Sequence, residues 1–187
     1  VYDAAGLNRP LNDEKIESAL KAGRLPIMMV NRFAQDDDWE TVIKTAALMP
    51  EADFFITGDP KEADREIKNM PANVFLTGYL SQPEYLKLMR RCRLVLAFTL
   101  RRDTVLWSLR EIMALNKPFV TTDSEVLRHY FGEVGLFVKS DPVELKEKIL
   151  QAVEKEKEIK NKINIFLEID KIRWDREIAE YKKYINN

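Results

Sequence analysis

Positively charged side chains and free backbone amides coincide between positions 99 and 107. Arg101 and Arg102 lie in a polar turn just before Thr104, where a helical pattern begins. The first amides of such a helix, here those of Thr104, Val105 and Leu106, have no carbonyl partner within it, and the helix dipole favours an anion beside them. The residue types and their spacing therefore predict an anion-binding site at this turn.

Two carboxylates, Asp103 and Glu111, lie eight positions apart in the same stretch. A carboxylate can accept hydrogen bonds from both hydroxyls of a vicinal diol, so Glu111 could hold a ribose, with each charge-assisted bond contributing about 1.5–3 kcal/mol. A glutamate on a helix is also commonly an ordinary surface residue. The spacing alone leaves both interpretations of Glu111 open.

Arg32, Gly58 and Gly78 each follow an apolar run that is predicted to be a strand. A guanidinium at a strand end suits bidentate phosphate binding, but Arg32 could equally be a surface arginine paired with Asp36 or Asp37. Glycine after a strand allows a positive φ or the close approach of a ligand to the backbone, or it forms a plain turn. Neither glycine belongs to a G-x-G-x-x-G pattern or a Walker loop, so the usual nucleotide-binding fingerprints are absent.

Six short apolar runs are predicted to be strands buried on both faces. They cover residues 25–30, 52–57, 74–77, 94–98, 118–120 and 135–138. Helical patterns separate them, so we predict an α/β fold: a doubly wound, Rossmann-like parallel sheet of about six strands with helices on both faces. Ligands of such sheets bind outside the carboxyl ends of the strands, which is where Thr99 and residues 100–107 are expected.

Capping residues and prolines set the expected helix boundaries. The expected helices are 12–22 (capped by Asn12), 39–49 (capped by Asp36, Asp37 or Asp38), 83–91 (beginning at Pro83), 104–116 (ending at Asn116), 124–130 (capped by Asp123 or Ser124) and a long helix opened by Asp141 and Pro142. Residues 61–69 are expected to form a polar helix or turn.

The chain divides into three expected regions: a lead-in and linker helix at 1–24, an α/β domain at 25–153, and carboxyl-terminal helices at 154–187. Residues 144–162 are rich in Lys and Glu, which predicts a solvated helix. Two apolar stripes at helical spacing follow: Ile159, Ile163, Phe166, Ile169 and Ile172, then Trp174, Ile178, Tyr181 and Ile185. The stripes pack either against this domain or against a second domain or partner.

The composition of the 187 residues is that of one globular domain, and a net charge of −1 gives no electrostatic case for binding nucleic acid. Cys92 is the single cysteine and no signal peptide is visible, so we expect a reducing, cytoplasmic location. His129 is expected to be structural, and no cluster of metal-ligating residues is seen. Because the chain begins with Val1 rather than Met, we expect a fragment of a longer protein.

The order of these pieces resembles the carboxyl-terminal half of GT-B glycosyltransferases, most closely the group 1 retaining family (family 4-like), over residues 25–153. The resemblance rests on short motifs in a fixed order. They are Phe98-Thr99, Arg101, Asp103-Thr104, Glu111-Ile112, Asn116-Lys117-Pro118 and the stretch from Thr122-Asp123 to Phe131. The combination is specific, although no single piece is.

In that family this half binds the nucleotide-sugar donor, here expected to be a UDP- or GDP-sugar, and needs no metal or other cofactor. The resemblance implies that Glu111 holds the ribose and that Asp103 contacts the donor sugar as the other catalytic residue. Arg32 then lies near the diphosphate, and Gly78-Tyr79-Leu80 is the loop that touches the base. The expected donor-binding residues are therefore Arg32, Gly58, Gly78, Tyr79, Leu80, Thr99, Arg101, Thr104, Val105, Leu106 and Glu111.

Two departures from the family pattern leave alternatives open. Asp37 stands where a phosphate-binding lysine is usual, and Asp103 is one methylene shorter than the usual glutamate. A non-catalytic GT-B-like module that binds a nucleotide or a partner is therefore a second hypothesis, and half of a sugar-nucleotide epimerase is a third.

The resemblance also implies a missing partner. In the family, an amino-terminal domain binds the acceptor and the last helix crosses back to it. We therefore expect this chain to be a donor-binding half that is inactive alone. Peripheral membrane association through the parent protein stays open.

Overall fold

The computed structural model describes residues 13–63, 66–67 and 69–185. The strands in these ranges are β1 (Leu25–Val30), β2 (Ala52–Thr57), β3 (Val74–Gly78), β4 (Leu94–Ala97), β5 (Phe119–Thr122) and β6 (Leu136–Val138). The helices are α1 (Asp13–Lys21), α2 (Trp39–Ala47), α3 (Gln82–Arg91), α4 (Trp107–Ala114), α5 (Glu125–Phe131), α6 (Pro142–Glu154) and α7 (Glu156–Ile185), with a 3-10 turn, η2, at Pro60–Glu62. The predicted lead-in with its cap Asn12, and part of the predicted helix or turn at 61–69, lie outside the described residues.

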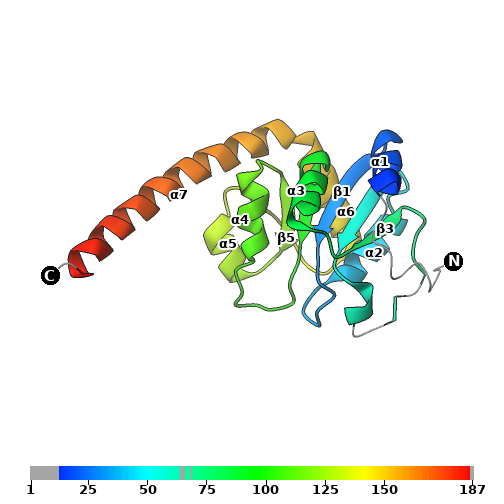
Figure 1. Cartoon of the computed structure of the whole chain (residues 1–187), viewed down its shortest axis with the longest axis horizontal. Coiled ribbons are helices and arrows are strands. Elements are labelled where there is room, and N and C mark those ends of the chain that lie inside the picture. Colours follow the sequence, from blue (N-terminus) through cyan, green and yellow to red (C-terminus); the bar gives the residue numbers. More distant parts are fainter. Residues whose placement is uncertain (1–12, 64–65, 68, 186–187) are drawn as a thin grey trace.

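The six strands form one parallel sheet in the order β3-β2-β1-β4-β5-β6 (Figure 1). The first strand in sequence lies inside the sheet: Ile27 of β1 is in register with Phe54 of β2 on one side and with Leu94 of β4 on the other. The chain therefore winds outward from β1 in both directions, and the predicted doubly wound α/β fold is confirmed.

Side chains of each strand alternate between two apolar layers, which explains why the strand sequences carry so few polar residues. Met28 of β1 lies in the layer formed with α3, α4, α5 and the start of α7. Its neighbours Ile27 and Met29 lie in the layer formed with α2 and α6. Both faces of the sheet are therefore covered, and a ligand of the sheet itself would bind at the strand ends.

One predicted helix start and one predicted helix cap are wrong. The fourth helix begins at Trp107 and not at Thr104, because residues 102 and 103 form a turn and Leu106 keeps an extended backbone at the N-cap position. At α2, Asp38 occupies the N-cap position but its side chain makes no capping hydrogen bond. At α3 and α5 the prediction is confirmed: α3 spans Gln82–Arg91, and Ser124 rather than Asp123 caps α5 by accepting from the Leu127 amide.

The Lys- and Glu-rich segment is not one solvated helix. It is interrupted at Lys155, and α6 buries Leu145 and Ile149 completely in the same layer as α2. The prediction failed because the charged residues of α6 outweighed the three residues that it buries, Leu145, Ile149 and Ala152.

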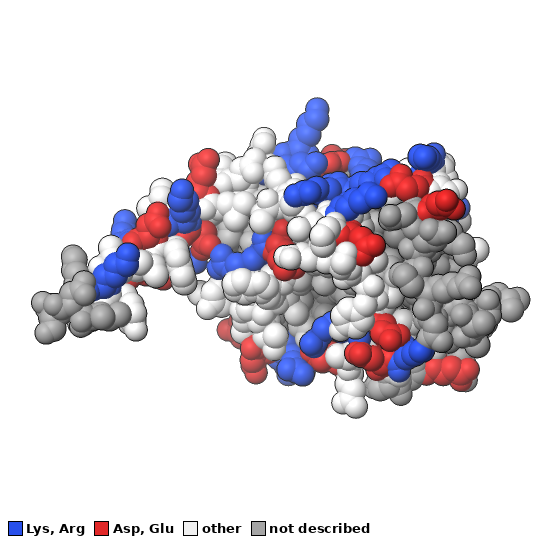
Figure 2. Space-filling view, in the orientation of Figure 1, with Lys and Arg blue, Asp and Glu red and all other residues white. Residues whose placement is uncertain are grey.

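The last helix, α7, is packed at its start and uncovered further along. Ile159 and Ile163 are buried in the core, whereas Ile169 and Ile172 are each 62% exposed and Trp174 is 63% exposed. This half of α7 leaves the body of the molecule (Figure 1), and uncharged side chains reach its surface between charged ones (Figure 2). Within the described residues, no helix is long and apolar enough to span a membrane.

Candidate functional site

The loops that follow β1 and β4 define the place where a ligand would bind. These two strands are neighbours in the sheet, but β1 connects to β2 on one side and β4 connects to β5 on the other. After these two strands the chain therefore continues in opposite directions across the sheet. The topological switch point lies at the carboxyl edge, between the loops 31–38 and 98–106.

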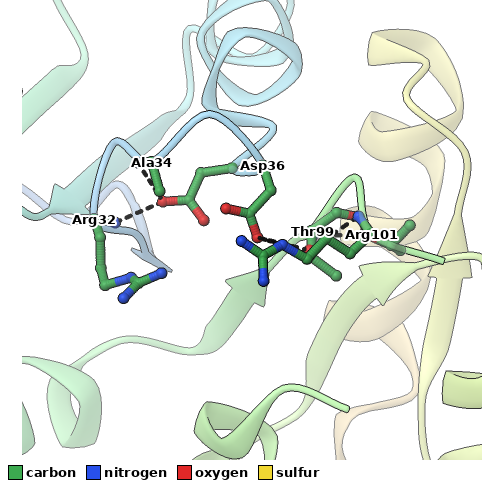
Figure 3. Close-up of polar contacts among 7 residues, drawn as sticks. Arg32, Ala34, Asp36, Thr99 and Arg101 are labelled. Carbon is green, nitrogen blue, oxygen red and sulfur yellow. Dashed lines mark hydrogen bonds and ion pairs between the residues drawn. The ribbon is translucent and has the colours of Figure 1, made fainter. Parts of the chain in front are cut away.

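The loop after β1 is built around the carboxylate of Asp37. Its Oδ2 accepts hydrogen bonds from the backbone amides of Arg32 (2.9 Å) and Ala34 (3.0 Å), which are drawn in Figure 3. Phe33, between them, has a φ of 63° and a fully buried ring that packs against Trp39 at 5.7 Å. A bulky residue in the left-handed region is strained, and burial of the ring together with the Asp37 bonds holds it there.

The neighbouring carboxylate, Asp36, joins this loop to the loop after β4. Its Oδ2 lies 3.0 Å from Nε of Arg101 and accepts from the Thr99 hydroxyl at 3.3 Å (Figure 3). The backbone carbonyl of Asp36 also accepts from the Leu100 amide at 2.7 Å. The two loops are therefore tied side by side across the switch point.

Thr99 itself is fixed from the opposite side by β5. The Thr122 hydroxyl donates to the Thr99 carbonyl (2.9 Å) and accepts from the Thr99 amide (3.0 Å). The Thr99 hydroxyl also accepts from the amide of Arg101 at 3.2 Å. Threonine at these two positions thus orders the turn that carries Arg101.

The two arginines extend to the same side of Asp36 (Figure 3). Asp36 contacts Nε of Arg101 at 3.0 Å, and no described hydrogen bond uses the terminal nitrogens of that guanidinium. The sequence left open whether Arg32 pairs with Asp36 or Asp37. No ion pair joins the Arg32 side chain to any described residue, because Asp36 binds Arg101 and Asp37 binds the backbone.

Gly58 and Gly78 have positive φ values of 95° and 69°, and the amide of Gly58 donates to the carbonyl of Gly78 at 3.2 Å. The close approach expected at Gly58 is made by the chain itself. A Cβ at Gly58 would lie 2.6 Å from the carbonyl oxygen of Asn31 and 2.9 Å from Cα of Arg32. Glycine is therefore required for the turn after β2 to support the Arg32 loop.

The segment before α4 differs from the predicted helix start. Thr104 and Val105 precede the helix and Leu106 is its N-cap, so the first unpaired helix amides are those of Trp107 and Ser108. The Leu109 amide already bonds to the Leu106 carbonyl. Val105 and Trp107 are exposed, and the Trp107 side chain is 75% accessible. The anion-binding amides expected at 104–106 are thus displaced by about one turn.

Glu111 and Asp103 have different surroundings. Asp103 lies exposed in the turn before α4. Glu111 is half-buried on α4, where its Oε2 accepts a 3.0 Å hydrogen bond from the hydroxyl of Tyr85 on α3. Burial raises the pKa of Tyr85 strongly and the charge of Glu111 raises it further, so Tyr85 remains a protonated donor. No described hydrogen bond joins Asp103 to Glu111.

The third predicted contact loop, residues 78–80, lies between β3 and α3. Tyr79 is exposed at this edge, whereas Leu80 is half-buried against the layer that contains α3 and α4. Ser81 and Glu84 then form a capping box that starts α3. The loop is therefore anchored on one side by a strand and on the other by a well-capped helix.

Comparison with protein families identifies the chain. Residues 24–155 match the family described as Glycosyl transferases group 1. The chain belongs to this family. The match confirms the resemblance to the carboxyl-terminal half of GT-B enzymes, and it covers every predicted donor-binding residue of this group 1 domain. No curated protein sequence gives a significant match.

Solved structures share the fold of this group 1 domain at low sequence identity. HepE from Anabaena in complex with UDP-glucose has a TM-score of 0.72 at 15% identity, covering 97% of this chain and 53% of HepE. The α,α-trehalose-phosphate synthase (UDP-forming) from Burkholderia vietnamiensis has a TM-score of 0.68 at 13% identity, covering 96% and 49%. The UDP-GlcNAc 2-epimerase from Neisseria meningitidis, bound to UDP-GlcNAc, has 0.55 at 16%, covering 82% and 43%. The chain thus spans about half the length of these structures.

Sequence reasoning missed two residues of the group 1 domain that the structure places at the site. Tyr85 was assigned only to a helix, because nothing in the spacing of 85 and 111 indicates contact. Asp36 was considered as a helix cap or a partner of Arg32, but it binds Arg101 and Thr99 instead. The role of Asp36 could have been predicted by comparing the polar residues that follow one predicted strand with those that follow the neighbouring strand.

Proposed function

We propose that this chain is the donor-binding half of a retaining glycosyltransferase and binds a UDP- or GDP-sugar at the loops after β1 and β4. The observation that carries the proposal is that Arg32 and Arg101 stand on the two loops that Asp36 ties together at the switch point. Two forked guanidinium groups suit a diphosphate. The fold shared with HepE in complex with UDP-glucose supports this assignment.

The chemistry follows from where charge develops. As the bond between the sugar and the nucleoside diphosphate breaks, negative charge builds on the leaving diphosphate. Arg32, Arg101 and the free amides of Trp107 and Ser108 would stabilise that charge without reorganising. The ties of Asp36 and Asp37 hold both arginine-bearing loops in place before the donor arrives.

The rest of the donor would be held by three further groups. Glu111 would accept hydrogen bonds from the ribose hydroxyls, and Asp103 would orient the sugar. The backbone of Gly78-Tyr79-Leu80 would touch the base. Thr99 and the extended segment Thr104, Val105 and Leu106 would line the path between diphosphate and sugar.

An acceptor-binding amino-terminal domain would complete the enzyme, so we expect the isolated chain to bind the donor without turnover. The uncovered half of α7, with Ile169, Ile172 and Trp174, is the surface that such a domain would cover. We infer a cytoplasmic location, which suits a domain whose cysteine, Cys92, is a free thiol. Burial raises the pKa of that thiol to about 12 and makes it a structural rather than a reactive group.

Thermal unfolding in the presence of UDP, GDP, ADP and their common sugar conjugates tests the proposal. A ligand that binds only the folded state raises its stability by RT ln(1 + [L]/Kd), so one nucleotide should raise the midpoint clearly. Arg32→Ala and Arg101→Ala should each remove most of that rise. Arg90→Ala, an exposed arginine at the far end of α3, is the matched control and should leave the rise unchanged.

Two observations favour alternative functions, and each alternative predicts a different experimental outcome. The pairing of Asp36 with Arg101 reduces the net positive charge at the site, which favours a non-catalytic module. A midpoint of thermal unfolding that no nucleotide raises would favour the non-catalytic module. The likeness to UDP-GlcNAc 2-epimerase favours half of a sugar-nucleotide epimerase. The full-length enzyme would then release an epimer or free sugar rather than a glycoside.

A further inference from the structure

The hydrogen bond between Tyr85 and Glu111 connects two helices that begin at the carboxyl edge of the sheet. Tyr85 is the fourth residue of α3, and Glu111 is the fifth of the eight residues of α4. The hydroxyl of Tyr85 lies 3.0 Å from Oε2 of Glu111, and both side chains are half-buried. The bond therefore holds the Glu111 carboxylate in one orientation.

Only part of the Glu111 carboxylate is used by this bond. Tyr85 reaches Oε2, and no described residue donates a hydrogen bond to Oε1. An ionised carboxylate accepts about four hydrogen bonds through its two oxygens. Glu111 is therefore fixed by one donor and keeps the capacity to accept from both hydroxyls of a vicinal diol.

The tyrosine is itself rigidly connected to the loop at 78–80. The Tyr85 amide donates to the Ser81 carbonyl at 2.9 Å, and the capping box of Ser81 and Glu84 fixes the start of α3. Leu80 packs into the layer that α3 and α4 share. The loop that would touch the base and the carboxylate that would hold the ribose are thus joined through Tyr85.

We infer that Tyr85 is a positioning residue that aligns Glu111 with the ribose and so sets the preference of this site for ribonucleotides over 2′-deoxyribonucleotides. The inference rests on the proposed function. A fixed acceptor discriminates strongly between a ligand with the hydroxyl and one without it, because it is already desolvated and oriented for that hydroxyl. A carboxylate free to rotate would lose part of this discrimination.

Binding of UDP and 2′-deoxy-UDP to the whole chain by calorimetry tests the inference, with GDP and 2′-deoxy-GDP used if only GDP stabilises the protein. Tyr85→Phe should weaken UDP binding about three- to tenfold and 2′-deoxy-UDP binding less, because 2′-deoxy-UDP offers Glu111 only the 3′-hydroxyl. Tyr130→Phe, a partly exposed tyrosine on α5, is the control and should change neither affinity. The ratio of the two affinities reports on the ribose contact and does not respond to a general loss of stability.

A double-mutant cycle separates the possible failures. If Tyr85 acts through Glu111, Tyr85→Phe should have no further effect on the ratio in a Glu111→Ala background. An unchanged ratio in Tyr85→Phe, with a ratio that collapses in Glu111→Ala, would overturn the inference and leave the proposed function intact. If the wild-type chain binds neither UDP nor GDP, the proposed function fails and the inference fails with it.

Discussion

At the residue scale, the adjacent aspartates Asp36 and Asp37 have different structural roles. Asp37 turns inward and accepts the amides of its own loop, whereas Asp36 reaches across to Arg101 and Thr99. Both negative charges are therefore matched by specific donors. An aspartate in place of a phosphate-binding lysine need not abolish a site whose loops it organises.

Glu111 carries the sharpest prediction at this scale. Glu111→Ala removes the proposed acceptor of two ribose hydroxyls, each bond contributing about 1.5–3 kcal/mol, so nucleotide binding should weaken about a hundredfold or more and stay measurable at high ligand concentration. The residue is half-buried at a helix surface, so the domain should still unfold cooperatively. Calorimetric titration with UDP and GDP, with Glu133→Ala as an exposed control, checks this. An unchanged affinity would refute the ribose assignment.

Gly58 offers a test of how the Arg32 loop is supported. Gly58→Ala combines an unfavourable φ of 95° with a contact of 2.6 Å to the Asn31 carbonyl, whereas Gly23→Ala at a φ of 73° meets no atom within 4 Å. Denaturant unfolding should show a cost of about 1 kcal/mol for Gly23→Ala. The cost for Gly58→Ala should be larger by about 1–3 kcal/mol. Equal losses of stability in the two variants would mean that the Arg32 loop shifts to accommodate the added methyl group.

At the element scale, the strands were predictable and the polar ties between loops were not. A strand buried on both faces, such as β2 with its six buried residues, is recognisable in the sequence as a mostly apolar run. Thr99 and Asp36, by contrast, are 63 positions apart, and no local pattern relates them. The start of α4 was misplaced because the helical spacing of apolar residues already includes Leu106, but the chain turns at 102–103 and Leu106 is the N-cap residue.

The connection from β5 to α5 provides a prediction on pH. Hydrogen bonds from Arg128 hold the pKa of Asp123 below its usual range, and the same guanidinium lies 4.9 Å above the Phe137 ring. An acid with a lowered folded pKa contributes stability above its unfolded pKa of about 3.9, and that stability is lost as the pH falls through the lowered value.

Asp123→Asn should therefore lower the free energy of unfolding near neutral pH by no more than about 1 kcal/mol, because Arg128 is largely exposed. The variant should also lose less stability than the wild type between neutral pH and pH 3. Urea titrations across this range measure both effects. Glu147→Gln, on an exposed residue of α6, should leave the pH dependence unchanged, and a parallel curve for Asp123→Asn would contradict the linkage.

At the scale of the whole molecule, α7 divides into a half that packs on the domain and a half whose apolar side chains are exposed. Ile163 is fully buried, so Ile163→Asp would bury a lone charge and should cost more than about 3 kcal/mol. Ile172→Asp, at a 62% exposed position, should change the stability of the isolated chain by less than about 0.5 kcal/mol.

The exposed half of α7 should bind an amino-terminal half supplied as a separate chain. Ile172→Asp should weaken that association, whereas Lys171→Glu beside it should have a smaller effect. The exposed indole of Trp174 gives a direct signal, since its emission should shift to shorter wavelength as the partner covers it. If Ile172→Asp leaves the affinity between the two halves unchanged, the interface lies elsewhere.

The position of β1 inside the sheet has a consequence for the order of events during synthesis. The pairing of Ile27 with Phe54 is available soon after β1 leaves the ribosome, but its pairing with Leu94 must wait for some sixty further residues. The loop with Arg32 therefore emerges early, and Arg101 joins it only when β4 docks. We expect the nascent chain to acquire any affinity for a nucleotide in a single late step, when the second half of the sheet is added.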